Sequence, residues 1–385
     1  MTTRSHLTAR NVVALSFFLN GLCFSTWVSR IPEARSGFDL SNGSLGLLLL
    51  TIAIGSLIAL PTTGALIAAF GTVRVVRCGA LAAATGLLAA AIGLGNVLPL
   101  TAAGLFVYGV GIGVWDVAMN VEGAEVERHL GRAIMPRFHA GFSLGTVVGA
   151  LAGAGLVALD VPAVWHLSLV AVGALVLVWT TAGSFLPVAE VPHADRPGAL
   201  GAWLEPRTLV IGVMVLALAL TEGTANDWLA VALVDGYDAS HSTGVAGFAL
   251  FVAAMTVCRF VGTGLIDRFG RVQVLWSTMV AAGAGVLLIV LGQHPVVVAV
   301  GILLWGAGAA LGFPVGMSAA ADDPVHAAAR VSVVSTIGYA AFLAGPPLLG
   351  FVGDRVGTLE SLLVVACVLV PAALAVPAAR EPARR

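Results

Sequence analysis

The chain has 385 residues, of which 59% are hydrophobic and only 10% are charged. Soluble domains are about 25% charged on average, so this composition excludes a soluble protein of this size. The net charge of −1 also excludes the strongly basic surface of a nucleic-acid-binding protein.

Twelve apolar runs are long enough to cross a bilayer, whose hydrocarbon core of about 30 Å needs roughly 20 residues of helix. The sequence therefore predicts an all-α membrane protein with 12 transmembrane helices. The expected helices are 11–31, 43–69, 75–94, 98–121, 136–159, 163–186, 208–234, 243–266, 272–292, 295–320, 328–352 and 357–379.

A gap rich in proline and charge divides these helices into two groups of six. We expect an N-terminal half at 1–187, a cytoplasmic linker at 188–207 and a C-terminal half at 208–385. Cytoplasmic loops of membrane proteins are rich in basic residues. An N-terminus inside the cell places 15 of the 19 arginines on the cytoplasmic side, so both termini are predicted to be cytoplasmic.

The two halves repeat one another. Trp27 and Trp228 lie in the first helix of each half, 201 residues apart, and Gly71 and Gly270 end the second helices, 199 residues apart. Two parallel six-helix halves are typical of secondary transporters, which place their substrate site between the repeats near the middle of the membrane.

Small residues and prolines suggest where helices pack or bend. Gly145, Gly149 and Gly153 allow close helix approach, and we expect this surface to slide against the other half. The segment GPP at 345–347 is expected to break or kink the eleventh helix. Three glutamates after the fourth span are expected to form a solvated helix end: Glu122, Glu125 and Glu127.

The fourth helix contains the first candidate site. Asp116 and Asn120 are four residues apart, so they share a helix face. An acid within a membrane span is costly, by about 2.5–3.5 kcal/mol on insertion scales, and is usually functional. We predict that Asp116 binds a proton and Asn120 a substrate; the alternative is a structural acid satisfied by its neighbours.

The seventh and eighth helices hold the second candidate site. Glu222 is predicted to be a second proton-binding carboxylate, and Asn226 one turn later a substrate ligand. Asp227 is predicted to contact substrate; the alternatives are a capping role or a contact at an outer gate. Arg259 is predicted to pair with Glu222 or Asp116, either as a switch or as a static partner.

Other polar and aromatic residues complete the candidate set. His139, at the start of the fifth helix, is a further proton-coupling candidate, because histidine titrates near neutral pH. Arg30 is expected at the outer mouth, as a substrate anchor or a snorkelling side chain. The remaining predicted substrate contacts are Asn20, Trp27, Trp115 and Trp228. For the tryptophans the alternative is packing or interfacial anchoring.

The segment TGLIDRFGR at 263–271 resembles the loop between the second and third helices of each half in the major facilitator superfamily. In that family the loop locks the cytoplasmic side. The resemblance implies a cytoplasmic gate at Asp267, Arg268, Gly270 and Arg271. The matching first-half loop, GALIAAFGT, has Ala68 and Ala69 in place of the acid and the arginine.

Several further segments, including NVEGAEVE at 120–127 and EGTANDWL at 222–229, resemble the YbjJ-like branch of that superfamily. This branch consists of bacterial inner-membrane proteins and is similar to the fucose–proton symporters. The symporters have an acid–x–x–x–Asn pair in the fourth helix, as Asp116 and Asn120 do here. They also have an acid before a proline in the first helix, where this chain has Arg30 before Pro32.

Together these observations predict a proton-coupled secondary transporter of a small polar, sugar-like solute. We also expect a monomer, and the resemblance implies a bacterial inner membrane. Two alternatives are proton-driven efflux of a more apolar compound and a non-transporting sensor or scaffold. The sequence has no nucleotide-binding loop of the G-x-x-x-x-G-K-[ST] type and no convergent catalytic set, so we expect no enzyme. The four cysteines lack metal-ligand spacing, so we expect no metal and no cofactor.

Overall fold

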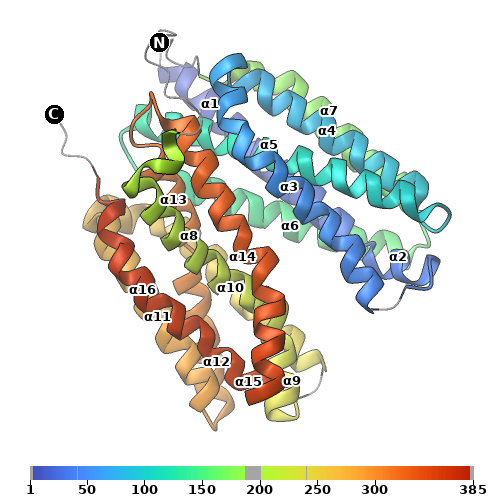
Figure 1. The fold of residues 1–385 in the computed structure, drawn as a ribbon, viewed down its shortest axis with the longest axis vertical. Helices are drawn as coiled ribbons and strands as arrows, with labels where there is room; N and C mark the ends of the chain where they lie inside the picture. Colours follow the sequence, from blue (N-terminus) through green and yellow to red (C-terminus); the bar gives the residue numbers. More distant parts are fainter. Residues whose placement is uncertain (1–2, 41, 187–200, 240, 382–385) are drawn as a thin grey trace. The chain divides into compact units, whose positions relative to one another are not determined.

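The computed structural model describes residues 3–40, 42–186, 201–239 and 241–381, and the regular elements among them are all helical (Figure 1). Twelve segments within these ranges are long and apolar enough to cross a membrane. The predicted class of an all-α protein with 12 spans is thus confirmed. The predicted linker, 188–207, lies for the most part outside the described residues.

The chain forms two compact units. Unit 1 comprises Met1–Gly131, Arg137–Ala202 and Asp323–Ser332. Its elements are α1 (Thr3–Val28), α2 (Ile31–Gly37), α3 (Asn42–Phe70), α4 (Thr72–Gly93), α5 (Leu98–Leu130), α6 (Met135–Ala158), α7 (Ala163–Thr181) and η1 (Ala182–Ser184).

Unit 2 comprises Arg132–Pro136, Trp203–Asp322 and Val333–Arg385. Its elements are α8 (Pro206–Thr224), the π-helical turn η4 (Ala225–Leu229), α9 (Ala230–Tyr237), α10 (His241–Phe269), α11 (Arg271–Leu291), α12 (Pro295–Ala309), α13 (Gly312–Ala320), α14 (Ala327–Val356), α15 (Thr358–Ser361), α16 (Leu363–Ala375) and η5 (Val376–Ala379). The short turn η3 (Gly201–Leu204) spans the boundary between the units.

The internal repeat extends to the backbone of equivalent loops. Gly71 before α4 has φ 79° and ψ 159°, and Gly270 before α11 has φ 78° and ψ 160°. A positive φ is easily adopted only by glycine. The two glycines that the sequence pairs across the halves therefore make the same turn.

The helix interruptions differ from the predicted ones. Of the break or kink expected at 345–347, the break is wrong, because α14 continues through Pro346 and Pro347 to Val356. Proline is tolerated inside membrane helices because neighbouring groups satisfy the freed backbone. Two interruptions lie close to candidate site residues: one in the tenth span, between α12 and α13, and one in the seventh, at the π-helical turn η4.

The fourth span is longer than expected, and this changes the surroundings of its glutamates. Helix α5 continues to Leu130 and ends at Gly131, which has φ 63°. Glu125 does lie at this end, where it pairs with Arg128. Glu122, however, is only 1% exposed, so the prediction that it belongs to a solvated helix end is wrong.

The glycines of α6 pack inside unit 1. A methyl group placed on Gly145 would lie 2.0 Å from the carbonyl oxygen of Phe18 on α1, and one on Gly149 would lie 2.8 Å from that of Leu22. The prediction of a surface that slides against the other half is therefore wrong for these residues. They allow α6 to approach the backbone of α1 instead.

Candidate functional site

The predicted pair on α5 is buried and hydrogen-bonded. Asp116 is 6% exposed and Asn120 is fully buried. The amide nitrogen of Asn120 donates to Asp116 Oδ1 at 3.2 Å and to the Asp116 backbone carbonyl at 2.9 Å. The spacing of four residues thus brings the two side chains together, as the sequence predicts.

His139 on α6 joins this pair. Its Nε2 lies 3.1 Å from Asn120 Oδ1, and its ring meets Phe17 edge-on with centroids 4.9 Å apart. Because the amide oxygen only accepts, His139 Nε2 is the donor in this contact. The three side chains form a hydrogen-bond chain: His139 donates to Asn120, and Asn120 donates to the carboxylate of Asp116.

Trp27 and Trp115 pack inside unit 1. Each is 1% exposed, and the indole nitrogen of Trp115 donates to Ser16 Oγ at 2.7 Å. Asn20 is also buried, at 4% exposure. A ligand stacks on an exposed ring face, so the structure favours the packing alternative for the two tryptophans.

Arg30 does not snorkel, because it is 2% exposed. Its Nε donates to His166 Nδ1 at 3.2 Å, its Nη1 pairs with Glu33 at 2.9 Å, and its Nη2 donates to the Val161 carbonyl at 2.9 Å. These contacts join the end of α1 to α2, α7 and the turn before α7. The expectation of a side chain reaching to the outer interface is therefore wrong; Arg30 closes one end of unit 1.

In unit 2, Glu222 on α8 pairs with Arg259 on α10 at 2.9 Å. The side chains are 18% and 4% exposed, respectively. Arg259 Nε also donates to the carbonyl of Ala310 at 3.2 Å, at the interruption between α12 and α13. The guanidinium therefore connects a membrane carboxylate to a backbone carbonyl. In an uninterrupted helix, such a carbonyl would accept a hydrogen bond from within the helix.

Asn226, Asp227 and Trp228 form the middle of the π-helical turn η4. Asn226 and Asp227 are exposed, whereas Trp228 is half-buried. An α-helical wheel does not apply across this turn, because its hydrogen bonds run from residue i to i+5. Such turns occur often at functional sites.

The predicted cytoplasmic-gate residues make separate contacts within unit 2. Asp267 Oδ1 accepts from the backbone N–H of Ala133 at 2.7 Å, and Arg268 lies over the ring of Phe269. Gly270 supplies the turn before α11. Arg271 Nη1 binds Asp322 at 2.6 Å.

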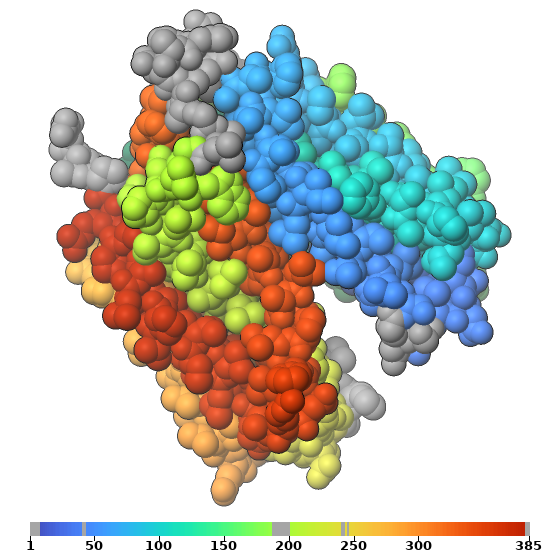
Figure 2. All heavy atoms as spheres, in the orientation of Figure 1, coloured from blue at the N-terminus to red at the C-terminus, as the bar shows by residue number. Residues whose placement is uncertain are grey.

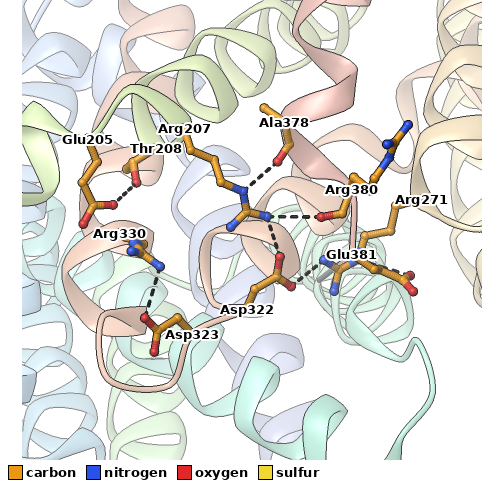
Figure 3. Close-up of polar contacts among 10 residues, drawn as sticks. All are labelled: Glu205, Arg207, Thr208, Arg271, Asp322, Asp323, Arg330, Ala378, Arg380 and Glu381. Carbon is orange, nitrogen blue, oxygen red and sulfur yellow. Dashed lines mark hydrogen bonds and ion pairs between the residues drawn. The ribbon is translucent and has the colours of Figure 1, made fainter. Parts of the chain in front are cut away.

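The sequence analysis missed an ionic cluster around Asp322 (Figure 3). Asp322 is 6% exposed and is held by Arg207 and Arg271, each at 2.6 Å. Arg207 also donates to the carbonyls of Ala378 at 3.0 Å and Arg380 at 3.4 Å. The cluster ties together the starts of α8 and α11 and the ends of α13 and η5. The only sign of this cluster in the sequence was an arginine at the start of each of two helices, Arg207 and Arg271.

Glu122 occupies the equivalent place in unit 1, 200 residues before Asp322. Its carboxylate accepts from Thr72 Oγ1 at 3.0 Å and from the backbone N–H of Leu186 at 2.5 Å. Thr72 begins α4, as Arg271 begins α11. The two repeats thus use the same acid position, once with neutral donors and once with two arginines.

Asp323, which belongs to unit 1 and lies outside the spans, makes a third polar group. His326 Nδ1 lies 2.5 Å from its carboxylate, Arg330 lies at 3.6 Å, and the N–H of Val325 donates at 3.0 Å. Partial burial opposes ionisation, but these hydrogen bonds and charges outweigh it and hold the pKa of Asp323 below its usual value. Among the described residues, no group of three or more His, Cys, Asp or Glu could hold a metal ion.

Comparison with known proteins identifies the family. The profile of the Major Facilitator Superfamily matches residues 13–323 and 211–385. An uncharacterized transporter, y4wD, of Sinorhizobium fredii is 36% identical over 91% of this chain and 93% of its own length. An uncharacterized MFS-type transporter of Yersinia pestis is 33% identical over 88% of each chain.

Solved structures show the same fold. The transporter FucP in its outward conformation superposes with a TM-score of 0.81, covering 98% of this chain and 100% of FucP, at 15% identity. With the profile match and the two relatives above 30% identity, this shows that the chain belongs to the Major Facilitator Superfamily and is a multi-pass membrane transporter rather than an enzyme.

Proposed function

We propose that this transporter couples the movement of a small polar, sugar-like solute to protons by alternating access. The observation that supports this proposal is a carboxylate within a polar network in each half. Asp116 lies in the network with Asn120 and His139, and Glu222 lies in the pair with Arg259. Polar networks of this kind are expensive within a membrane and usually mark an ion or substrate pathway.

Asp116 is the proton carrier of the first half in this proposal. As a carboxylate it accepts from the amide of Asn120, whose orientation is set by His139. Adding a proton removes the charge that these donors stabilise. The network can therefore respond to protonation of Asp116.

Glu222 is the proton carrier of the second half. Protonation removes the charge that attracts Arg259, while Arg259 keeps its contact with the Ala310 carbonyl. Because this carbonyl lies where α12 gives way to α13, the charge of Glu222 acts on a point at which the tenth span can bend. The acid and the bend thereby become coupled.

The choice of a sugar-like solute is supported by the residues and by one neighbour. A further FucP structure, of a variant, is described as the fucose:proton symporter of E. coli and superposes with a TM-score of 0.79 at 15% identity. We extend only the class of substrate to this chain. Asn226 and Asp227 provide polar groups suited to hydroxyls.

We further propose a bacterial inner-membrane location, a monomer, and both termini in the cytoplasm. The orientation rests on the distribution of the arginines, 15 of 19 of which then lie on the cytoplasmic side. A cysteine introduced at Asp160, in the exposed turn before α7, should react with an impermeant maleimide added outside spheroplasts. Labelling only after lysis would contradict this orientation.

The coupling is tested in proteoliposomes that contain a pH-sensitive dye, with D-glucose, L-fucose, D-xylose and myo-inositol as probes. The wild type should show proton influx with at least one probe, and Asp116→Asn and Glu222→Gln should reduce it at least ~10-fold, as expected when general proton transfer is lost. Asp160→Asn is the control, because Asp160 is exposed and has φ 52°, which asparagine tolerates. Full probe-driven proton influx in Asp116→Asn would refute its coupling role.

A further inference from the structure

Two arginines near the start of α4 have no carboxylate partner. Arg74 is exposed and Arg77 is half-buried, and their spacing of three residues places them on one face of the helix. In the described part of the chain, neither side chain forms an ion pair. The sequences of α4 and of its neighbour α7 contain no aspartate and no glutamate. Both charges therefore have to be balanced from outside the protein.

Helix α7 lies beside these arginines. Figure 1 shows α4 and α7 side by side, and the blue atoms of α4 lie on the surface of unit 1 in Figure 2. Arg77 Nη2 donates to the backbone carbonyl of Trp179 on α7 at 2.7 Å, and its guanidinium lies 5.5 Å from the centroid of the indole ring. Trp179 is 48% exposed. Tryptophan and arginine together near the ends of two spans are typical of the membrane–water interface.

The second half joins the equivalent helices without a charge. At the offset of 199 residues that relates the glycine turns, Arg77 corresponds to Trp276 of α11. Arg74 corresponds to Gln273. The indole nitrogen of Trp276 donates to the carbonyl of Ala373 on α16 at 3.0 Å. One neutral N–H is thus enough to join the third and sixth spans of a half.

Helix packing therefore does not explain the charge of Arg77. A guanidinium has five N–H donors. In the described part of the chain, the one acceptor for those of Arg77 is the Trp179 carbonyl, and its Nε is buried without a partner. The planar fork of a guanidinium matches the oxygens of a phosphate. Arg74, one turn away, provides a second positive charge for the same anion.

The surroundings select the source of the phosphate. Leu81 follows Arg77 by about one turn of α4 towards the middle of its span, and it is 42% exposed. Val176 precedes Trp179 by about one turn of α7, also towards the middle of its span, and it is 53% exposed. A phospholipid presents a phosphate at the membrane surface and apolar chains below it, in the same order. A free phosphate ion has no use for the apolar part.

We propose that Arg74, Arg77 and Trp179 form a binding site for the headgroup of an anionic phospholipid. The two guanidinium groups bind the phosphate, and Leu81 and Val176 contact the acyl chains. A net negative headgroup is favoured over a zwitterionic one because two arginines without carboxylate partners meet a single phosphate. The site is independent of the proposed substrate and of its coupling to protons.

The test is lipid binding to the purified full chain in a neutral detergent, measured by thermal stabilisation and by native mass spectrometry. Dioctanoyl phosphatidylglycerol is the anionic probe. Dioctanoyl phosphatidylcholine has the same chains and a phosphate but no net charge, and dioctanoylglycerol lacks the phosphate. Glycerol 3-phosphate and inorganic phosphate lack the chains. We expect phosphatidylglycerol to bind with a Kd at least ~5-fold lower than any of the others, the effect of one arginine near an anionic lipid.

Substitutions then locate the site. Arg77→Gln and Arg74→Gln should each weaken phosphatidylglycerol binding ~5-fold, because each removes one charge. Arg77→Trp introduces the residue of the second half, which keeps an N–H for the Trp179 carbonyl and removes the charge. It should weaken binding as much as Arg77→Gln, so the loss does not come from a broken link between the helices.

The control is Arg35→Gln, which makes the same change of charge at an exposed position of α2. Because α2 precedes α3 and α4 follows it, Arg35 and Arg77 lie near opposite ends of α3. The control should leave the Kd unchanged within ~2-fold, the scatter of a surface substitution away from the site.

Four results would overturn the proposal. Phosphatidylcholine or dioctanoylglycerol binds as tightly as phosphatidylglycerol, which shows binding by the chains alone. Glycerol 3-phosphate or inorganic phosphate binds as tightly, which shows a site for a free anion. Wild-type affinity for phosphatidylglycerol persists in Arg77→Trp or in Arg74→Gln. Finally, Arg35→Gln weakens binding as much as Arg77→Gln, which shows a response to net charge and not to a site.

Discussion

The pair of helices α1 and α6 in unit 1 and the pair α8 and α14 in unit 2 occupy equivalent places in the repeat but pack differently. In the first pair, methyl groups placed on Gly21 and Gly145 would lie 2.2 and 2.0 Å from backbone carbonyl oxygens of the partner helix. In the second pair, Gly223 of α8 meets the side chain of Phe342, and Gly345 of α14 meets that of Leu220. Backbone atoms of a helix cannot move away from an added methyl group, whereas a side chain can rotate away from it.

The two acid positions show the same contrast. Glu122 is bound by a threonine hydroxyl and a backbone N–H, whereas Asp322 is bound by two arginines. At these particular positions, unit 1 uses close backbone packing and neutral donors, whereas unit 2 uses side-chain packing and ion pairs. Equivalent positions in a repeat can thus keep their geometry while the interactions that stabilise them change.

A large loss of stability is expected from breaking the backbone contact of the first pair. Gly145→Ala should lower the free energy of unfolding by about 3 kcal/mol, because overpacking against backbone has no cheap relief. Thermal unfolding in detergent measures the loss. Gly155→Ala, in the same helix, is the control, since no atom lies within 4 Å of the added methyl group.

Gly223→Ala tests the second helix pair in the same way. The added methyl group would lie 3.2 Å from the end of the Phe342 ring, which can rotate away. We expect a loss of at most about 1 kcal/mol, the lower end of the range for overpacking. Equal destabilisation by Gly145→Ala and Gly223→Ala would contradict the contrast between the pairs.

Neutral substitutions at the two acid positions, Asp322 and Glu122, should also differ in how much stability they cost. Asp322→Asn removes the shared partner of two arginines, one of them only 13% exposed, and should cost about 3 kcal/mol. Glu122→Gln keeps one acceptor oxygen for the N–H of Leu186, and its NH2 group can donate to the Thr72 hydroxyl, so it should cost about 1 kcal/mol. Chemical or thermal unfolding of both variants measures the difference. A larger loss for Glu122→Gln would show that buried neutral donors depend on the charge.

The smallest effect is expected at Asp323, whose side chain is 39% exposed. Its pKa is lowered in the folded protein, so the stability that it contributes is present above its ordinary pKa of about 3.9. That contribution is lost as the pH falls through the lower folded value. Asp323→Asn should therefore be slightly less stable than the wild type at pH 7, and the difference should shrink as the pH falls below about 3.9. A difference that grows in acid would contradict this sign.

The candidate site was predictable where it depends on neighbours along the chain. Asp116 and Asn120 are four residues apart on one helix, so their contact follows from helix geometry. The contact of His139 with Asn120 depends on how α6 packs on α5, which no spacing within α5 specifies. The same is true of Asp322, whose arginines come from positions 207 and 271.

Burial separates the correct from the incorrect side-chain predictions. Arg30 and Glu122 lie near span ends, where a charged group usually reaches water. Their partners, His166 and Leu186, lie far along the chain and bury them instead. The tryptophans follow the same logic: helical position marks Trp115 as cavity-facing, but the hydroxyl of Ser16 receives its indole N–H inside unit 1.

By itself, the amino-acid sequence determines the 12 spans, the repeat and the Asp116–Asn120 pair, because the cost of placing a residue in a bilayer and the pitch of a helix are local properties. Only the tertiary structure decides which apolar or charged residues face a neighbouring helix. Hydropathy is the same for a side chain packed in lipid and one packed in protein. The pairing of Glu222 with Arg259 and the approach of Phe342 to Gly223 of α8 therefore emerge only when the helices pack.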